Sequence, residues 1–147
     1  MLLNSASSAI WYLLLFVYSV AISMFTARLA HQIAAWLILE RSVYNLWYWP
    51  SYLTFGVAAA VVYLPVFQWI RDRLKGTRPR SLFALAGLLL GIVPALFHGS
   101  FIESRLPDRT SIETILIYCM YGVSGFVFGH CYVAMCRFEG NGIVSAG

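Results

Sequence analysis

Apolar residues dominate four stretches of the chain, and shorter segments between them carry most of the charged residues. Each stretch is long enough to cross the hydrocarbon core of a bilayer, which takes about 20 helical residues. The pattern predicts transmembrane helices near residues 9–26, 51–70, 82–101 and 112–135. We therefore expect an all-α membrane protein, a single integral membrane domain over residues 1–147 built as a bundle of four transmembrane helices.

The segment between the first two predicted helices, residues 28–50, is too apolar to be an ordinary solvated loop. It ends in the aromatic residues 47–49, whose types settle at the level of lipid headgroups. Two interpretations fit: the first helix extends beyond the membrane surface, or a short helix lies in the interface. We expect the interfacial helical and aromatic segment. The side chains that would then dip into lipid are Leu29, Ile33, Trp36 and Leu37.

Charge refines this picture. Only 11% of the residues are charged, against about 25% in soluble domains, so the expected partner is the lipid bilayer rather than nucleic acid. Five of the ten Lys and Arg residues lie in residues 71–80, and positive loops stay in the cytoplasm. We place this loop and both termini on that side of a bacterial inner membrane or an organellar equivalent. The five, also candidates for binding anionic lipid, are Arg71, Arg73, Lys75, Arg78 and Arg80.

Small residues recur at helical spacing in three of the four stretches. Close approach through small side chains is what brings helices together in lipid. The expected helix-packing glycines are Gly87, Gly91, Gly122, Gly125 and Gly129, and the first stretch carries a small polar stripe of Ser19, Ser23, Thr26 and Ala30. The same spacing puts Ala84, Pro94 and His98 on the face of Gly87 and Gly91. Whether these faces pack within the chain or against another subunit stays open.

Two prolines, Pro65 and Pro94, fall in the middle of predicted helices. Each lacks the N–H that an α-helix needs and should kink its helix. Prolines are ordinary in membrane helices. The alternative is that the kink at Pro94 opens a pocket beside His98.

The three histidines are candidates for cofactor binding. A b-type haem in a helical bundle needs two histidines at similar depth. His98 and His130 lie toward opposite surfaces, whereas His31 and His98 both lie near the outer surface and could pair. However, His31 sits about 100° from the small stripe of its helix. We predict no cofactor, keep haem at His31 and His98 as an alternative to ordinary hydrogen bonding, and assign no role to His130.

Few side chains suggest catalysis. The six carboxylates all lie in loops or at the ends of predicted spans, which argues against a proton-coupled antiporter. The three cysteines include no C-x-x-C, so we expect neither a disulfide framework nor a metal site. In the loop between the third and fourth predicted helices, which we expect on the outer side, Arg105 and Arg109 could bind a lipid headgroup or phosphate, with His98 as acid or base. The ordinary alternative is that Asp108 or Thr110 caps the next helix.

We assign no catalytic residue and expect no enzyme. The expected function is a non-catalytic helical subunit or scaffold of a larger membrane complex, with other membrane-protein subunits as partners. One alternative is a small transporter or channel for an uncharged or lipid-like solute. A further alternative is a membrane enzyme or b-type cytochrome that uses His98.

Overall fold

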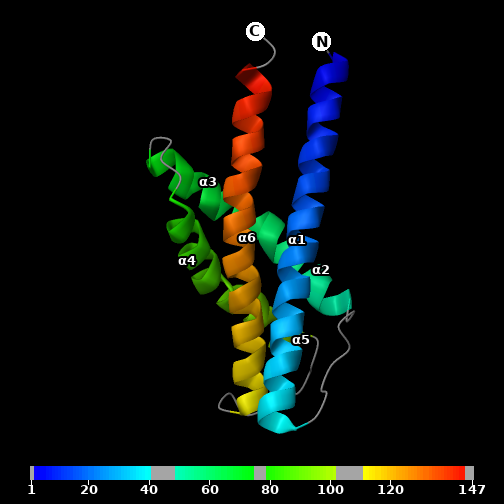
Figure 1. The fold of residues 1–147 in the computed structure, drawn as a ribbon, viewed down its shortest axis with the longest axis vertical. Helices are drawn as coiled ribbons and strands as arrows, with labels where there is room; N and C mark the ends of the chain where they lie inside the picture. Colours follow the sequence, from blue (N-terminus) through cyan, green and yellow to red (C-terminus); the bar gives the residue numbers. More distant parts are fainter. Residues whose placement is uncertain (1, 41–48, 75–78, 102–110, 145–147) are drawn as a thin grey trace.

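The computed structural model describes residues 2–40, 49–74, 79–101 and 111–144, and these parts of the chain are helical. Figure 1 shows the order of the helices along the chain. They are α1 (Leu2–Leu39), α2 (Trp49–Ala58), the π-helix η1 (Ala59–Tyr63), α3 (Leu64–Arg73), α4 (Arg80–Leu90), α5 (Ile92–Phe101) and α6 (Ile112–Val144). An all-α fold is confirmed.

Among the described residues, four helical segments are long and apolar enough to cross a membrane, the same number of membrane-length segments that the sequence predicts. Their bounds are Ala9–Leu39, Trp49–Arg73, Arg80–Gly99 and Ile112–Arg137. The second segment joins α2, η1 and α3, and the third joins α4 and α5. The first is longer than expected, and the other three differ from the predicted ranges by a few residues at most.

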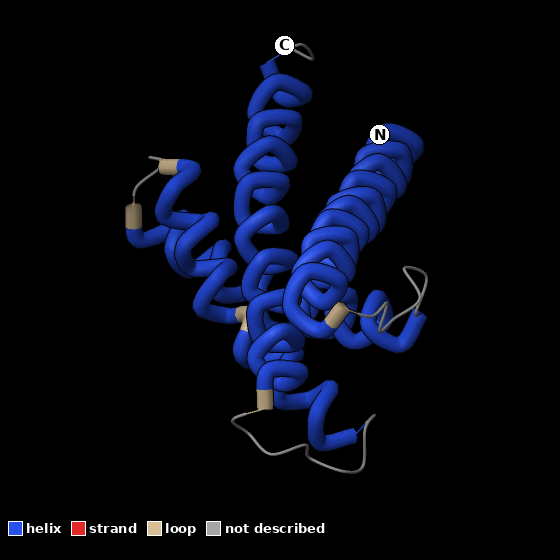
Figure 2. The backbone as a smooth tube through the Cα atoms, turned by 60° about the horizontal axis from the view of Figure 1, so that its bottom comes forward, coloured by secondary structure: helices blue, strands red, loops and turns tan. Residues whose placement is uncertain are grey.

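The four segments run alternately up and down (Figure 1). The start of α1 and the end of α6 lie at one end of the molecule, together with the end of α3 and the start of α4; we call this the terminal end and the other the far end. The long helices α1 and α6 lie together at the far end and separate toward the terminal end, as Figure 2 shows from a second direction. Burial follows this divergence, since Ser19 is the first buried residue among those described in α1.

The prediction of a separate interfacial helix after residue 26 is wrong. Residues 27–39 continue α1 without interruption, because this stretch contains no Gly or Pro and is rich in strong helix formers. The helix ends before Glu40, whose φ of 52° is in the left-handed region that closes many helices. The aromatic residues 47 and 48 lie outside the described part of the chain.

At both prolines, the regular α-helix is disturbed in the few residues on the N-terminal side. Pro65 follows η1, where Leu64 N donates to the carbonyl oxygen of Ala59 in a wider turn. In an α-helix Pro65 would need an N–H for the oxygen of residue 61, which it lacks, so the chain accommodates one extra residue there. Pro94 likewise cannot bond residue 90, and the regular helix is interrupted at the single residue Gly91 between α4 and α5, where Gly91 N still donates to the carbonyl oxygen of Gly87.

The core is aromatic and lies between the α2–α3 segment, α4 and α6. Its rings pack edge-on, tilted or stacked, with centroids 5.1 to 6.2 Å apart. The rings belong to Phe55, Tyr63, Phe67, Phe83, Phe128 and Tyr132. The outward faces of the helices also expose many large apolar side chains. Such a surface is expected of a helical bundle that is surrounded by hydrocarbon.

Candidate functional site

Four polar side chains from three helices are buried together toward the far end of the bundle. Arg28 and His31 come from α1, His98 from α5 and Tyr121 from α6, and their exposed fractions are 3%, 5%, 4% and 0%. All four belong to segments that are long and apolar enough to span a membrane. We call this group the polar cluster.

The spacing along α1 explains why two members of the polar cluster share one face. Arg28 and His31 are three residues apart, which places them on the same side of a helix. Met24, Ala27 and Ala35, at the same helical spacing, are buried with them. Of the small polar stripe that the sequence predicts, Ser19 and Ser23 are buried, but Thr26 and Ala30 are exposed. His31 therefore points into the bundle, contrary to its predicted offset from the packing face.

The most direct contact in the polar cluster joins α5 to α6. Tyr121 Oη and His98 Nδ1 are 2.9 Å apart, and the two ring centroids are 5.7 Å apart. When the phenol donates to Nδ1, the ring proton of a neutral imidazole lies on Nε2. The predicted face of α4 and α5 is buried here, since His98 follows Gly91 and Pro94 on the same side.

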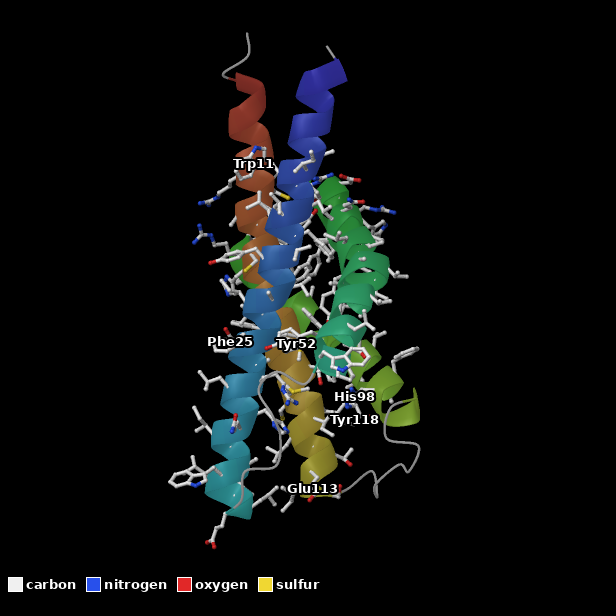
Figure 3. The ribbon with its side chains drawn as sticks, turned by 90° about the vertical axis from the view of Figure 1, so that its right-hand side faces the viewer. Trp11, Phe25, Tyr52, His98, Glu113 and Tyr118 are labelled. Carbon is white, nitrogen blue, oxygen red and sulfur yellow. The ribbon has the colours of Figure 1, made fainter. Side chains whose placement is uncertain are left out.

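Arg28 is the charged member of the polar cluster and lies close to several of its neighbours. Its Nη1 lies 4.0 Å from the thioether sulfur of Met120 on α6. Its charge acts on the imidazoles of His31 and His98 and on the phenol of Tyr52 at the start of α2. Figure 3 shows Tyr52 and His98 at neighbouring heights in the far half of the molecule. The guanidinium of Arg28 therefore lies close enough to act on two imidazoles and on the phenol of Tyr52.

A further polar group lies beside Tyr52. Ser51 is completely buried at the start of α2, and its hydroxyl has no hydrogen-bond partner among the described residues. The helix that carries Ser51, α2, packs against both α1 and α5. A buried hydroxyl without a partner costs free energy.

Glycines hold α4 against α6 and so position α5. A Cβ on Gly87 would collide with the carbonyl group of Gly125, and one on Gly129 would collide with that of Phe83. A Cβ on Gly91 would lie 2.6 Å from the carbonyl oxygen of Tyr121. Backbone therefore touches backbone across this seam, which is the close approach that small residues permit. The glycine faces of α4 and α6 pack on each other within the chain.

The three predicted anion-binding residues that the structure describes lie away from the polar cluster. Arg71 Nε is 3.5 Å from Asp72 Oδ1, and the guanidinium of Arg73 lies 5.4 Å from the centre of the Trp69 ring. Arg80 is exposed at the start of α4. Four further candidates, Lys75, Arg78, Arg105 and Arg109, lie outside the described residues, as do the proposed caps Asp108 and Thr110.

The structure also shows the cap at the start of α6 and the surroundings of His130. The Oγ of Ser111 accepts from the N–H of Thr114 at 3.2 Å, so Ser111 supplies a cap at the start of α6. His130 is exposed and lies against Phe126, with ring centroids 5.0 Å apart. It takes no part in the polar cluster.

The cofactor expectations concern the same place. The structure brings His31 and His98 near one guanidinium, and haem ligation by this pair stays a hypothesis that an absorption spectrum of the purified protein tests. Within the described ranges, no group of three or more His, Cys, Asp or Glu side chains is arranged to hold a metal ion.

Sequence reasoning missed Arg28, Tyr121 and Ser51. One signal was available for Arg28, since it lies within an unbroken apolar run, and a charged residue inside such a run is a functional candidate by default. Nothing in the sequence distinguishes Tyr121 or Ser51 from other polar residues of these helices.

Comparison with protein-family models, with curated proteins and with solved structures found no match for this chain. The function therefore has to be argued from the polar cluster and from the helices that form it.

Proposed function

We propose that the chain is an integral membrane protein that binds and moves a lipid-like solute at the polar cluster. The observation that carries this proposal is the burial of Arg28, which is always charged and only 3% exposed. Charged residues inside apolar, membrane-length helices commonly form substrate or ion sites.

The interruptions in two spans support movement rather than binding alone. The second span contains the π-helix η1, and the third has a single irregular residue, Gly91, between α4 and α5. Single π turns occur frequently at functional sites, and discontinuous membrane helices are typical of transporters. Gly91 lies seven residues before His98, so a change of angle between α4 and α5 would move His98 relative to Arg28.

A scaffold or subunit function is the second candidate, and one observation favours it. The apolar run of α1 has 31 residues and that of α4 and α5 has 20, which correspond to about 46 Å and about 30 Å of helix. The excess length of α1 would have to tilt in the bilayer or be covered by a partner. The glycine faces no longer support this function, because they pack within the chain.

Lipid movement can be tested in proteoliposomes that contain phosphatidylcholine carrying a fluorophore on one acyl chain. Dithionite destroys the fluorophores it can reach, so moving lipid brings the inner-leaflet pool out to be quenched. We expect the protein to quench this pool, and Arg28→Gln to slow quenching about tenfold. Arg137→Gln removes the same charge from an exposed site on α6 and should leave the rate unchanged.

Folded wild-type protein that gives no more quenching than protein-free vesicles would refute the transport proposal. If that protein also purified from native membranes in fixed stoichiometry with another subunit, the second candidate would replace it.

A further inference from the structure

The inner face of α5 is built from small or polar side chains. Pro94, Ala95 and His98 are buried, and they follow Gly91 at helical spacing. In lipid, apolar side chains that face outward do not hold a helix against a bundle. The attachment of α5 therefore depends on close packing of its small residues and on polar pairs. The exposed large apolar residues of α5 are Ile92, Val93, Leu96 and Phe97.

A polar pair joins this inner face to α6. Tyr121 is completely buried, and its Oη lies 2.9 Å from Nδ1 of His98, which is hydrogen-bonding distance. The two ring centroids are 5.7 Å apart, with 55° between the ring planes. Hydrogen bonds between side chains of different helices strengthen helix contacts in a membrane, so this pair fastens α5 to α6.

Tyr121 also contacts the chain where α5 begins. A Cβ on Gly91 would lie 2.6 Å from the carbonyl oxygen of Tyr121, so Gly91 packs directly on that backbone. One residue of α6 thus meets the third span at two points, through its backbone at Gly91 and through its side chain at His98. The two points are seven residues apart, which is about 10 Å of helix.

Between these two points the third span has a place where it can bend. Pro94 has no N–H for the carbonyl oxygen of Leu90, so one hydrogen bond of the helix is missing there. Prolines kink helices at such places. On the N-terminal side, α4 is fixed because Gly87 packs on the backbone of Gly125. A bend near Leu90 would therefore carry α5, with His98, away from α6 while α4 stays in place.

We propose that α5 is a lid at the polar cluster, and that the hydrogen bond between Tyr121 and His98 is the latch that keeps this lid closed. Opening separates His98 from Tyr121 and gives access to the polar cluster from the side of α5. Tyr121 is a positioning residue here, because it holds His98 rather than a solute. The inference rests on the proposed function, since it names how access to that same site is regulated.

The alkylation rate of a cysteine placed under the lid measures opening. Ala95→Cys puts a thiol on the buried face of α5, where Ala95 is 3% exposed, so N-ethylmaleimide reaches it when α5 moves. Tyr121→Phe keeps the ring and removes the hydroxyl. We expect it to speed alkylation at position 95 about fivefold, the factor that one hydrogen bond contributes. Tyr118→Phe, which changes a half-buried tyrosine one turn earlier on α6, should leave that rate unchanged.

Two further measurements separate a latch from general stabilisation. Cys136 is buried on α6, and peptide mass spectrometry measures its alkylation in the same sample; this rate should not change when only α5 opens. His98→Ala removes the other side of the pair and should also speed alkylation at position 95. Adding Tyr121→Phe to it should change the rate by less than about twofold, because the bond is already lost. Should Tyr121→Phe fail to fold, His98→Ala carries the test.

An unchanged alkylation rate at position 95 in folded Tyr121→Phe protein would overturn the latch and leave the transport proposal standing. Equal acceleration at Cys136 would also overturn it, because the hydrogen bond would then stabilise the whole fold. The expected acceleration at position 95 alone, in a protein that moves no lipid in vesicles, would uphold the latch and refute transport.

Discussion

Replacing Gly125 by alanine should destabilise the seam between α4 and α6. The added methyl group would collide with the carbonyl group of Gly87 and would lie 2.9 Å from the hydroxyl of Tyr63. The obstructing atoms on Gly87 belong to a helix backbone and cannot rotate away. The two helices would have to separate by on the order of 1 Å, which would loosen the contacts along the seam.

The expected cost follows from two opposing effects. Overpacking a well-packed interior costs about 1–3 kcal/mol, and a rigid backbone neighbour places this site toward the upper end. Alanine is favoured over glycine within a helix by about 1 kcal/mol, which offsets part of the cost. We expect a net loss of about 2 kcal/mol, or about 4–8 °C in Tm for a chain of this size.

Gly122 provides a matched control three residues earlier on the same helix. A Cβ there would meet Leu88 at 3.8 Å or more, which is ordinary contact. Gly122→Ala should therefore keep the helix-propensity gain and raise stability by up to about 1 kcal/mol. Thermal unfolding in detergent, followed by the helical circular dichroism signal, measures both variants. Equal stability of the two alanine variants would refute the seam argument.

Two further substitutions test individual features. Tyr63→Phe removes a buried hydroxyl that has no hydrogen-bond partner among the described residues, so unfolding in detergent should show a gain of about 1 kcal/mol; a loss of that size would mean that the hydroxyl is satisfied in the folded protein. Glu40→Gly places the residue best suited to φ 52° after the last residue of α1 and should stabilise the protein by about 0.5–1 kcal/mol relative to Glu40→Ala. If the two variants at position 40 unfold alike, the left-handed turn does not limit stability.

Part of the candidate site could be predicted from local patterns. The face of α4 and α5 follows from spacing, because Gly87, Gly91 and His98 fall on one side of a helix whatever surrounds it. The disturbances at Pro65 and Pro94 also follow locally, since each proline lacks one N–H. The end of α1 could not be inferred in the same way. The aromatic residues before α2 suggested an interface, and nothing in residues 27–39 stops a helix.

Arg28 shows why the rest of the site was missed. Near a helix end an arginine can bend its long side chain toward the headgroups, or it can turn inward to other helices. The choice depends on neighbours that are distant in sequence. Met120, which lies beside its guanidinium, is 92 residues away.

The sequence determined the all-helical fold, the number of membrane-length segments and the places where two of them are interrupted. These properties depend on side-chain hydrophobicity and backbone hydrogen bonding within single helices, which are local quantities. Only the tertiary structure decided which faces are buried and that Arg28, His31, His98 and Tyr121 meet. The physical reason is that lipid and helix interiors are both apolar, so hydrophobicity does not distinguish an inward face from an outward one. Packing of backbone on backbone at the glycines, and the pairing of polar groups across helices, make that distinction.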